Sequence, residues 1–183
     1  SIQLGDGGLG INLDFQGYHG LSSRFGVLTS AFYMSNPKST NGVLTRNKRS
    51  EFSCPDQFGV RLAAYANMGA ISTFVGGRAE GVPASDLIGS SEGYRRPGYA
   101  VSVEPGISYG KGPISAFVSV PIAVYRNRIQ SFEDKITTAE TGKFTQGDAA
   151  FADYLVNVGV SYRFGGHKMN SDQKGSLNIQ MGE

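Results

Sequence analysis

The chain contains few of the residues on which most catalytic and metal sites depend. Its 183 residues include two histidines, one cysteine and no tryptophan. With Cys54 as the single cysteine, an internal disulfide is excluded, and its polar neighbours favour an ordinary loop thiol over a redox or metal-binding role. His167 lies in a polar C-terminal stretch, so only His19 lies next to a predicted turn. The sequence predicts neither a metal site nor a cofactor.

The chain also lacks a strong net charge and a long apolar run. Its formal net charge is +2, and no basic tract is interleaved with aromatic residues, which argues against nucleic-acid binding. No stretch approaches the ~18 consecutive apolar residues of a transmembrane helix. A membrane β-barrel is still allowed, because only every second residue of its strands faces lipid. The length is that of one domain.

The clearest pattern in the chain is an alternation of period two. Odd-numbered residues from Tyr99 to Tyr109 are mostly apolar, whereas the even-numbered residues between them are small or polar. Such alternation is typical of a β-strand with two different faces. After the turn at 111–113, a second alternating run extends from Ile114 to Val124. Each run is close to the ~9–11 residues with which a tilted strand crosses a bilayer, so the pair is predicted to be a transmembrane hairpin.

The same pattern predicts an all-β fold with seven visible strands, at 10–20, 25–35, 57–67, 71–82, 99–110, 114–125 and 151–164. Short connections at 21–24, 68–70 and 111–113 alternate with long polar ones at 36–56, 83–98 and 126–150. This alternation is typical of an antiparallel transmembrane β-barrel of the bacterial outer membrane. We predict that 1–166 form this barrel and that 167–183 form a polar, flexible tail. A soluble β-sandwich is the alternative, because its strands also alternate.

The charges within the predicted strands all lie opposite the apolar face. With neighbouring amides they form the predicted lumen lining: Asp14, Gln16, Arg61, Asn67, Arg78, Glu80, Glu104, Asp153, Asn157 and Arg163. A slip of one residue would turn Glu104 or Asp153 toward lipid, so the register is well specified. Because the signs are mixed, two interpretations stay open. The charges either pair in a structural network or line a polar path for a solute.

Two further groups of residues suit a membrane barrel. Aromatic residues near strand ends on the apolar face predict an interfacial girdle, formed by Tyr99, Tyr109, Tyr154, Tyr162 and Phe164. Arginines at the outer strand ends are candidates for contact with lipopolysaccharide phosphates, although solvated loop charge is the preferred interpretation; they are Arg95, Arg96, Arg126 and Arg128. The acids of the last long connection are likewise interpreted as solvated charges rather than as a calcium site; they are Glu133, Asp134, Glu140 and Asp148.

Four short motifs resemble one known family. They are Val103-Glu104-Pro105-Gly106 with Ser108-Tyr109, Val118-Ser119-Val120-Pro121 with Tyr125-Arg126-Asn127-Arg128, the segment 147–154, and the terminal Ser161-Tyr162-Arg163-Phe164. Together, from about Asp6 to Phe164, the chain resembles the bacterial outer-membrane transporter family linked to meta-pathway phenol degradation. The resemblance implies a barrel with more than seven strands, and single-chain bacterial barrels use an even number. We therefore expect further strands from an upstream segment or from another chain.

The predicted function is a passive outer-membrane channel, not an enzyme. A small solute, aromatic or otherwise apolar according to the resemblance, would diffuse through the polar lumen, and the other partners would be outer-membrane lipid and lipopolysaccharide. Two alternatives stay open. One is a structural or plugged barrel that anchors a partner through its long loops. The other is an outer-membrane hydrolase in which His19 acts with Ser22 or Ser23.

Overall fold

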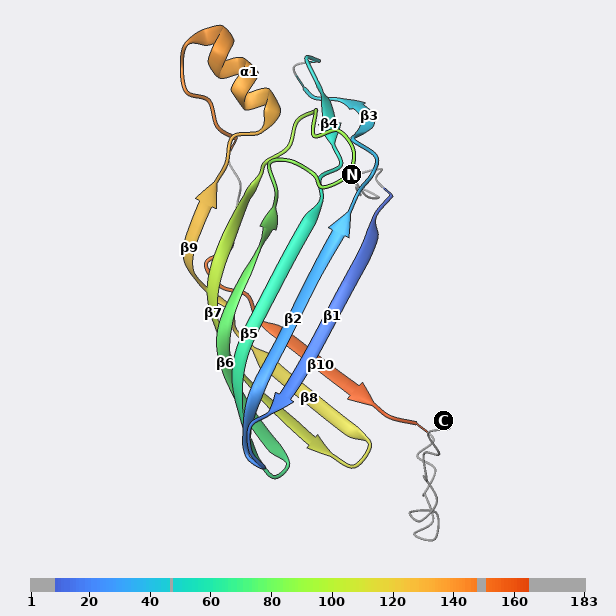
Figure 1. The fold of residues 1–183 in the computed structure, drawn as a ribbon, viewed down its shortest axis with the longest axis vertical. Helices are drawn as coiled ribbons and strands as arrows, with labels where there is room; N and C mark the ends of the chain where they lie inside the picture. The colour runs from blue at the N-terminus through green and yellow to red at the C-terminus, as the bar shows by residue number, and fades with distance from the viewer. Residues whose placement is uncertain (1–8, 47, 148–150, 165–183) are drawn as a thin grey trace, which may run out of the picture.

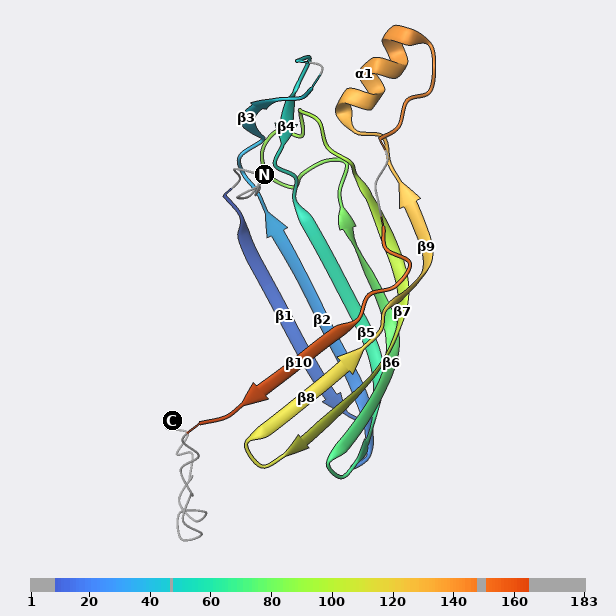
Figure 2. The same ribbon diagram turned by 180° about the vertical axis from the view of Figure 1, so that it is seen from behind.

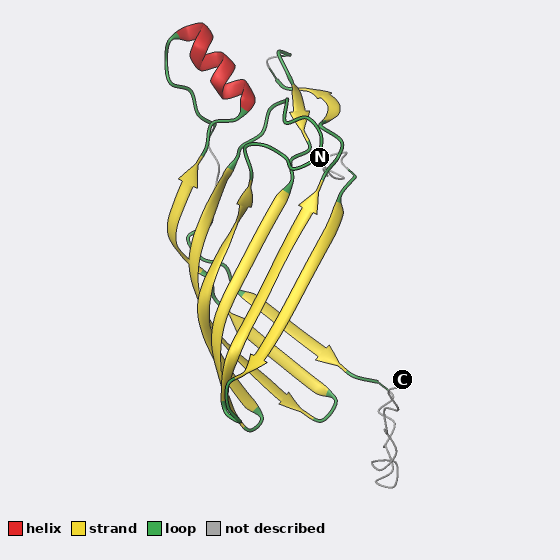
Figure 3. Ribbon diagram, viewed as in Figure 1, coloured by secondary structure: helices red, strands yellow, loops and turns green. Residues whose placement is uncertain are grey.

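The computed structural model describes residues 9–46, 48–147 and 151–164, which form an antiparallel β-sheet curled into a half-barrel (Figures 1 and 3). The predicted tail at 167–183 lies outside the described residues. The strands of the half-barrel are β1 (Ile11–Gly20), β2 (Phe25–Ser35), β5 (Gln57–Met68), β6 (Ile71–Val82), β7 (Gly98–Lys111), β8 (Ile114–Ser119), β9 (Ile122–Arg128) and β10 (Asn157–Tyr162). The predominantly antiparallel β-sheet is thus confirmed.

The strands follow one another around the sheet almost in sequence order. The order is β1-β2-β5-β6-β7-β8-β10, and β9 pairs with the other half of β7. Every pairing in the half-barrel is antiparallel. The short turns therefore gather at one end and the long connections at the other, as the sequence predicts (Figure 2). We call these the short-turn end and the long-loop end.

Glycines with positive φ make the tightest turns possible. Gly69, between β5 and β6, has φ of 74°, and Gly112, between β7 and β8, has φ of 60°. A side chain at such a φ crowds the backbone, so glycine is the residue that adopts it without strain. The turn between β1 and β2 uses another device, since the Ser22 hydroxyl accepts a hydrogen bond from the Phe25 amide at 3.0 Å.

The two faces of the sheet differ in chemistry as predicted. In β7, Glu104 is fully buried on the concave face, whereas Val103 and Ile107 on the opposite face are 44% and 48% exposed. Few apolar side chains of the described residues are buried, and they are Cys54, Ala63, Tyr65, Pro97, Ala100 and Pro121. A water-soluble domain of this size buries many more. The apolar residues of this chain cover the convex face of the sheet instead of filling a core.

Three phenylalanines lie on the otherwise polar concave face, and each is paired with a glycine of the neighbouring strand. The pairs across neighbouring strands are Phe32 with Gly59, Phe74 with Gly106, and Phe117 with Gly159. A Cβ added at any of these glycines would lie 2.2 Å from a carbon of the paired ring. The rings occupy the space that the missing side chains leave and cover the bare backbone, as described for aromatic residues beside sheet glycines.

Gly106→Ala is expected to lower the free energy of unfolding by about 1–3 kcal/mol, the usual cost of overpacking. The added Cβ would lie 2.2 Å from the Phe74 ring, which is held between strands. Gly110→Ala is the matched control, because it lies on the same strand and its Cβ would have no neighbour nearer than 4.0 Å. Urea unfolding of the protein in lipid vesicles measures both. Equal losses of stability in the two variants would contradict the role of the Phe74 ring.

The predicted bounds of the last two strands are wrong. The predicted strand at 114–125 is divided into β8 and β9, and the predicted strand at 151–164 is reduced to β10, preceded by a single bridge between Tyr154 and Ile122. Pro121 lies at the break and has no backbone N–H to donate to a neighbouring strand. The regular hydrogen bonding between neighbouring strands therefore stops at Pro121, and residues 151–156 are irregular.

Two of the long connections contain secondary structure that the sequence reading missed. The first includes a small hairpin of β3 (Thr40–Leu44) and β4 (Glu51–Ser53), and the third includes α1 (Phe132–Thr141). A capping box begins α1, because the Ser131 side chain accepts from the Asp134 amide and the Asp134 side chain accepts from the Ser131 amide. The helix ends at Gly142, with φ of 66°. No helix of the described residues is long and apolar enough to cross a bilayer.

Candidate functional site

The candidate site is the concave face of the half-barrel around Arg61, which we call the concave site. Two adjoining pockets share Arg61. One, of about 240 Å³, is lined by Asp14, Gln16 and Arg78 among others. The other, of about 500 Å³, is lined by Tyr18 of β1 and Phe117 of β8 among others. Strands from opposite parts of the sheet thus enclose one space, and several predicted lumen residues meet in it.

An ion pair between Arg61 and Glu104 forms the base of the concave site. Arg61 Nε lies 3.0 Å from Glu104 Oε2. The Glu104 side chain is fully buried, whereas 33% of the Arg61 side chain is exposed. Between them, β6 presents Gly76, which is paired directly with Glu104 and has no side chain to separate the two charges. One side of the Arg61 guanidinium therefore remains open to the concave space.

A line of hydrogen bonds extends the ion pair to the edge strand. The Ser119 hydroxyl donates to Glu104 Oε1 at 2.7 Å. The Asn157 side-chain amide in turn donates to the Ser119 hydroxyl at 3.3 Å. A buried carboxylate needs such partners, because burial of an unpaired charge is very costly. This contact places Asn157 with Glu104 as predicted and adds Ser119, which the sequence reading did not select.

The other charges of the concave face differ in their pairing. Arg78 forms an ion pair with Glu80, two residues along the same strand and on the same face. Asp14, on edge strand β1, is exposed and makes no hydrogen bond or ion pair with any described residue. The concave site therefore combines two paired arginines with one carboxylate that has no protein partner in the described part of the chain.

Three predicted lumen residues lie away from Arg61. Asn67 is at the short-turn end, where it accepts a hydrogen bond from Ser72. Asp153 lies in the irregular segment before β10, pairs with Arg126, and has an 86% exposed side chain. Arg163 follows the last residue of β10 and is exposed. The assignment of Asp153 to a strand was wrong for the reason given above, since the ladder breaks at Pro121.

The predicted girdle residues, four tyrosines and Phe164, are exposed or half-buried, and Tyr125 lies beside one of them. Tyr99 lies beside Tyr125, with ring centroids 6.0 Å apart, and Tyr162 lies beside Phe164 at 4.6 Å. An irregularity between Val101 and Ser102 shifts the pairing of β7 with β9 and brings Tyr125 opposite Val101. Tyr109 and Tyr154 are exposed.

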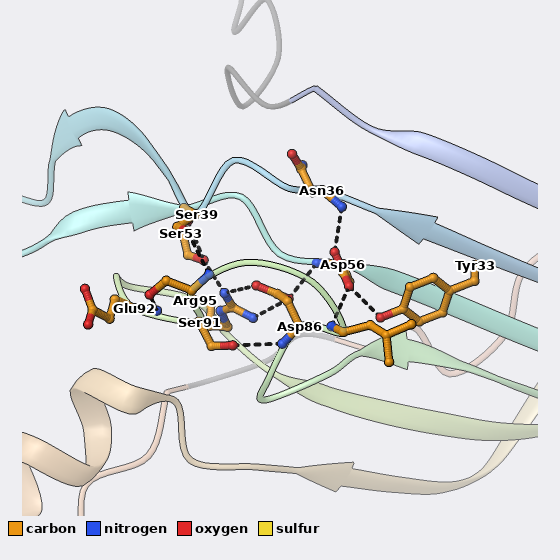
Figure 4. Close-up of polar contacts among 11 residues, drawn as sticks. Tyr33, Asn36, Ser39, Ser53, Asp56, Asp86, Ser91, Glu92 and Arg95 are labelled. Atoms are coloured by element: carbon orange, nitrogen blue, oxygen red, sulfur yellow. Dashed lines mark hydrogen bonds and ion pairs between the residues drawn. The ribbon is translucent and has the colours of Figure 1, made fainter.

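A second polar group lies at the long-loop end, and Figure 4 shows it. We call it the loop cluster; it comprises Tyr33, Ser53, Asp56, Asp86 and Arg95. The two terminal nitrogens of Arg95 donate to the two oxygens of Asp86 at 2.7 and 2.6 Å, and one of them also donates to the Ser53 hydroxyl at 2.6 Å. The side chains of Arg95 and Asp86 are both 0% exposed. The interpretation of Arg95 as a solvated loop charge was wrong, because it ties 36–56 to 83–98.

Asp56 connects the loop cluster to the barrel. Its buried carboxylate accepts hydrogen bonds from the Tyr33 hydroxyl, from the Asn36 amide at 2.6 Å and from the Leu87 amide at 3.0 Å. Burial by itself would raise the pKa of this carboxyl group, but the hydrogen bonds and the positive charge of Arg95 outweigh it. The pKa of Asp56 is therefore held below its usual value.

Acid is expected to loosen the loop cluster. A carboxyl group whose pKa is lowered on folding stabilises the fold above its unfolded pKa of about 4, and this contribution is lost as pH falls through the folded pKa. Pepsin cleavage within 83–98, relative to that of an unfolded reference peptide, should therefore rise as pH falls below 4. In Asp56→Asn, cleavage should already be high at pH 4 and change less with pH. An unchanged pH profile in that variant would contradict the role of Asp56.

The residues named for the hydrolase alternative lie on the convex face and in the turn between β1 and β2. His19 lies on the convex face, as do Leu13 and Phe15 of the same strand. The Ser22 hydroxyl accepts from the amides of Arg24 and Phe25, so it serves the turn. Among the described residues there is no hydrogen bond between His19 and a serine hydroxyl, and no group of three or more possible metal ligands.

Comparisons with protein-family models, with curated proteins and with solved structures give no significant match to this chain. The resemblance to the outer-membrane transporter family therefore stays a prediction from the motifs named above.

Proposed function

We propose that this half-barrel is part of an outer-membrane β-barrel that lets a small solute pass along its concave face. The observation that carries the proposal is the inverted distribution of side chains: charges lie inside the curl and apolar residues lie outside it. In water such an exposed apolar surface would be a liability. In a bilayer it is the required surface of a spanning barrel.

The apolar surface extends across the half-barrel from edge strand β1 to edge strand β10. Exposed side chains on the convex face include Ile11, Leu13, Phe15, Val60, Leu62, Val75, Val103, Ile107, Val158 and Val160. The tyrosine pair of Tyr99 and Tyr125 lies toward the long-loop end of the same face, and Tyr109 lies near the short-turn end. Aromatic residues at both borders of an apolar band are typical of membrane barrels.

The free edges of the sheet support a larger, closed barrel. Within the described residues, β1 and β10 each have a strand partner on one side only. Open edges are not tolerated in the apolar part of a bilayer, so further strands must pair with them. Both edge strands run from the long-loop end to the short-turn end. Antiparallel closure between them needs an odd number of added strands, from another segment of the chain or from another chain.

The concave site provides the polar path of this proposal. Arg61 and Asp14 line the same pocket, so a solute in it contacts charges of both signs. The Arg61–Glu104 pair fixes one guanidinium in place while part of it faces the open space. Passive passage needs no cofactor and no covalent step, and it requires that the site bind the solute weakly enough to release it.

Single-channel conductance of the full-length protein in a planar bilayer tests this function. Asp14→Lys should shift ion selectivity toward anions, because Asp14 faces the path and has no partner that would be lost. Glu140→Lys makes the same charge change on exposed α1 and should leave selectivity unchanged. A silent bilayer that contains inserted protein would reject the channel.

The loop cluster favours a second candidate, a barrel that is closed at its long-loop end and anchors a partner there. Buried contacts join Ser53 and Asp56 of the first long connection to Asp86 and Arg95 of the second. Such a barrel would stay silent in a bilayer, and its partner binding would depend on Arg95.

A further inference from the structure

A pocket of about 400 Å³ lies at the long-loop end, apart from the concave site. It lies between the β3–β4 hairpin, the segment 83–98 and α1. We call it the arginine pocket; its lining includes Thr45, Arg46, Arg49, Phe52, Tyr94 and Arg96. Neither the channel path nor the loop cluster uses Arg46 or Arg49, so the pocket calls for its own explanation.

The charge of the arginine pocket favours an anion. Three guanidinium groups line it, against two carboxylates from the first turn of α1, Glu133 and Asp134. The Asp134 carboxylate is already engaged, since one of its oxygens accepts hydrogen bonds from the Ser131 amide at 2.9 Å and the Gly147 amide at 3.2 Å. Arginine presents donors in a planar fork that matches carboxylate and phosphate oxygens.

A buried hydroxyl gives independent evidence of a polar ligand. Thr45 is only 9% exposed, and its Oγ1 has no hydrogen-bond partner among the described residues. Buried polar atoms nearly always have a partner, because desolvation without one is costly. Thr45 is part of the pocket lining, so an oxyanion held by Arg46 and Arg49 is a suitable acceptor for this hydroxyl.

The opposite side of the arginine pocket is aromatic. Phe52 and Tyr94 pack edge to face, with ring centroids 5.8 Å apart. The Arg96 guanidinium carbon lies 5.9 Å from the centre of the Tyr94 ring. These rings give a rigid apolar wall beside the positive charge, which suits a ligand with a charged end and an apolar body.

We propose that the arginine pocket binds the phosphate or carboxylate group of an organic anion whose apolar part contacts Phe52 and Tyr94. Arg46, Arg49 and the Thr45 hydroxyl hold the oxyanion. Two sources share this chemistry: a free small solute, and the phosphate-bearing headgroup of a surrounding lipid such as lipopolysaccharide. The proposal stands apart from conductance, because a silent barrel would keep the pocket.

Titration calorimetry of the full-length protein in detergent with phenyl phosphate tests the proposal. Arg46→Gln/Arg49→Gln should weaken binding at least tenfold, and Thr45→Val should weaken it about three- to tenfold, the effect of one lost hydrogen bond. Lys48→Gln is the control, since it removes one positive charge from the same loop at a residue that does not line the pocket. Its affinity should stay within twofold of the wild-type protein.

The source of the anion is decided by repeating the titration in vesicles with and without lipopolysaccharide. Weaker phenyl phosphate binding to the wild-type protein in the vesicles that contain lipopolysaccharide assigns the pocket to the lipid phosphate, and undiminished binding assigns it to a free solute. Two results would overturn the proposal. One is the absence of phenyl phosphate binding, and the other is an equal loss of affinity in Lys48→Gln. Circular dichroism confirms that each variant is folded.

Discussion

Arg61→Met is expected to lower the free energy of unfolding by about 3–5 kcal/mol, the usual cost of breaking a buried ion pair from one side. The variant would leave the Glu104 carboxylate, which is 0% exposed, with Ser119 as its remaining described partner. One hydroxyl does not compensate for a buried negative charge. Urea unfolding of the protein in lipid vesicles at neutral pH measures the loss.

Two further variants show whether the loss comes from the stranded charge. The double variant Arg61→Met/Glu104→Gln should recover most of the stability, because it removes both charges. Arg78→Met should cost clearly less than Arg61→Met, because its partner Glu80 is 28% exposed and keeps contact with water when the arginine is removed. Equal losses for Arg61→Met and Arg78→Met, with no recovery in the double variant, would contradict our account of Glu104.

Arg95→Met should release the long loops while the barrel stays folded. It would leave the Asp86 carboxylate buried without its cation, at a local cost of about 3–5 kcal/mol. Asp86 also accepts from the Asp56 amide at 2.9 Å, so the loosening should extend to the end of β5. Hydrogen exchange at neutral pH should increase about a hundredfold or more in 53–56 and 83–97 and remain slow in β6 and β7.

The control for Arg95 is an ion pair of the same chemistry on the surface. Arg126 pairs with Asp153, whose side chain is 86% exposed. Arg126→Met should therefore change the opening free energy derived from hydrogen exchange near residue 153 by less than about 1 kcal/mol, the usual limit for an exposed ion pair. If Arg95→Met had an equally small effect, the loop cluster would not be the element that orders the long-loop end.

The sequence predicted the features that depend on local alternation. The strands at 57–67 and 71–82, the alternation of long and short connections, and the inward direction of Glu104 all follow from period-two patterning. A one-residue error in register would move every side chain to the other face, so a strand with one polar and one apolar face is specified strongly.

The features that were missed depend on contacts between strands. Arg61 and Glu104 were both selected, but their pairing across Gly76 required the register of three strands. The contact of Phe74 with Gly106 does not follow from alternation within one strand, because the two residues lie on neighbouring strands. The burial of Arg95 depends on Asp86 and Ser53, which come from two different loops.

One missed element did have a local signal. A serine followed three residues later by an acid is typical of a helix N-terminus, and a glycine is typical of a helix C-terminus. The sequence has Ser131 and Asp134 at the first position and Gly142 at the second. The polar composition of 126–150 concealed this signal, because α1 has no long apolar stripe. Helix caps are therefore worth checking within long polar connections of predicted barrels.

The central claim is that the convex face of the sheet contacts lipid and the concave face contacts water. Nitroxide labels at each position from Val101 to Ser108 except Glu104 and Gly106, in the Cys54→Ala protein reconstituted in lipid vesicles, test it most directly. We expect accessibility to oxygen to peak at 101, 103, 105 and 107, and accessibility to a water-soluble nickel chelate to peak at 102 and 108. High nickel accessibility at all positions would contradict it.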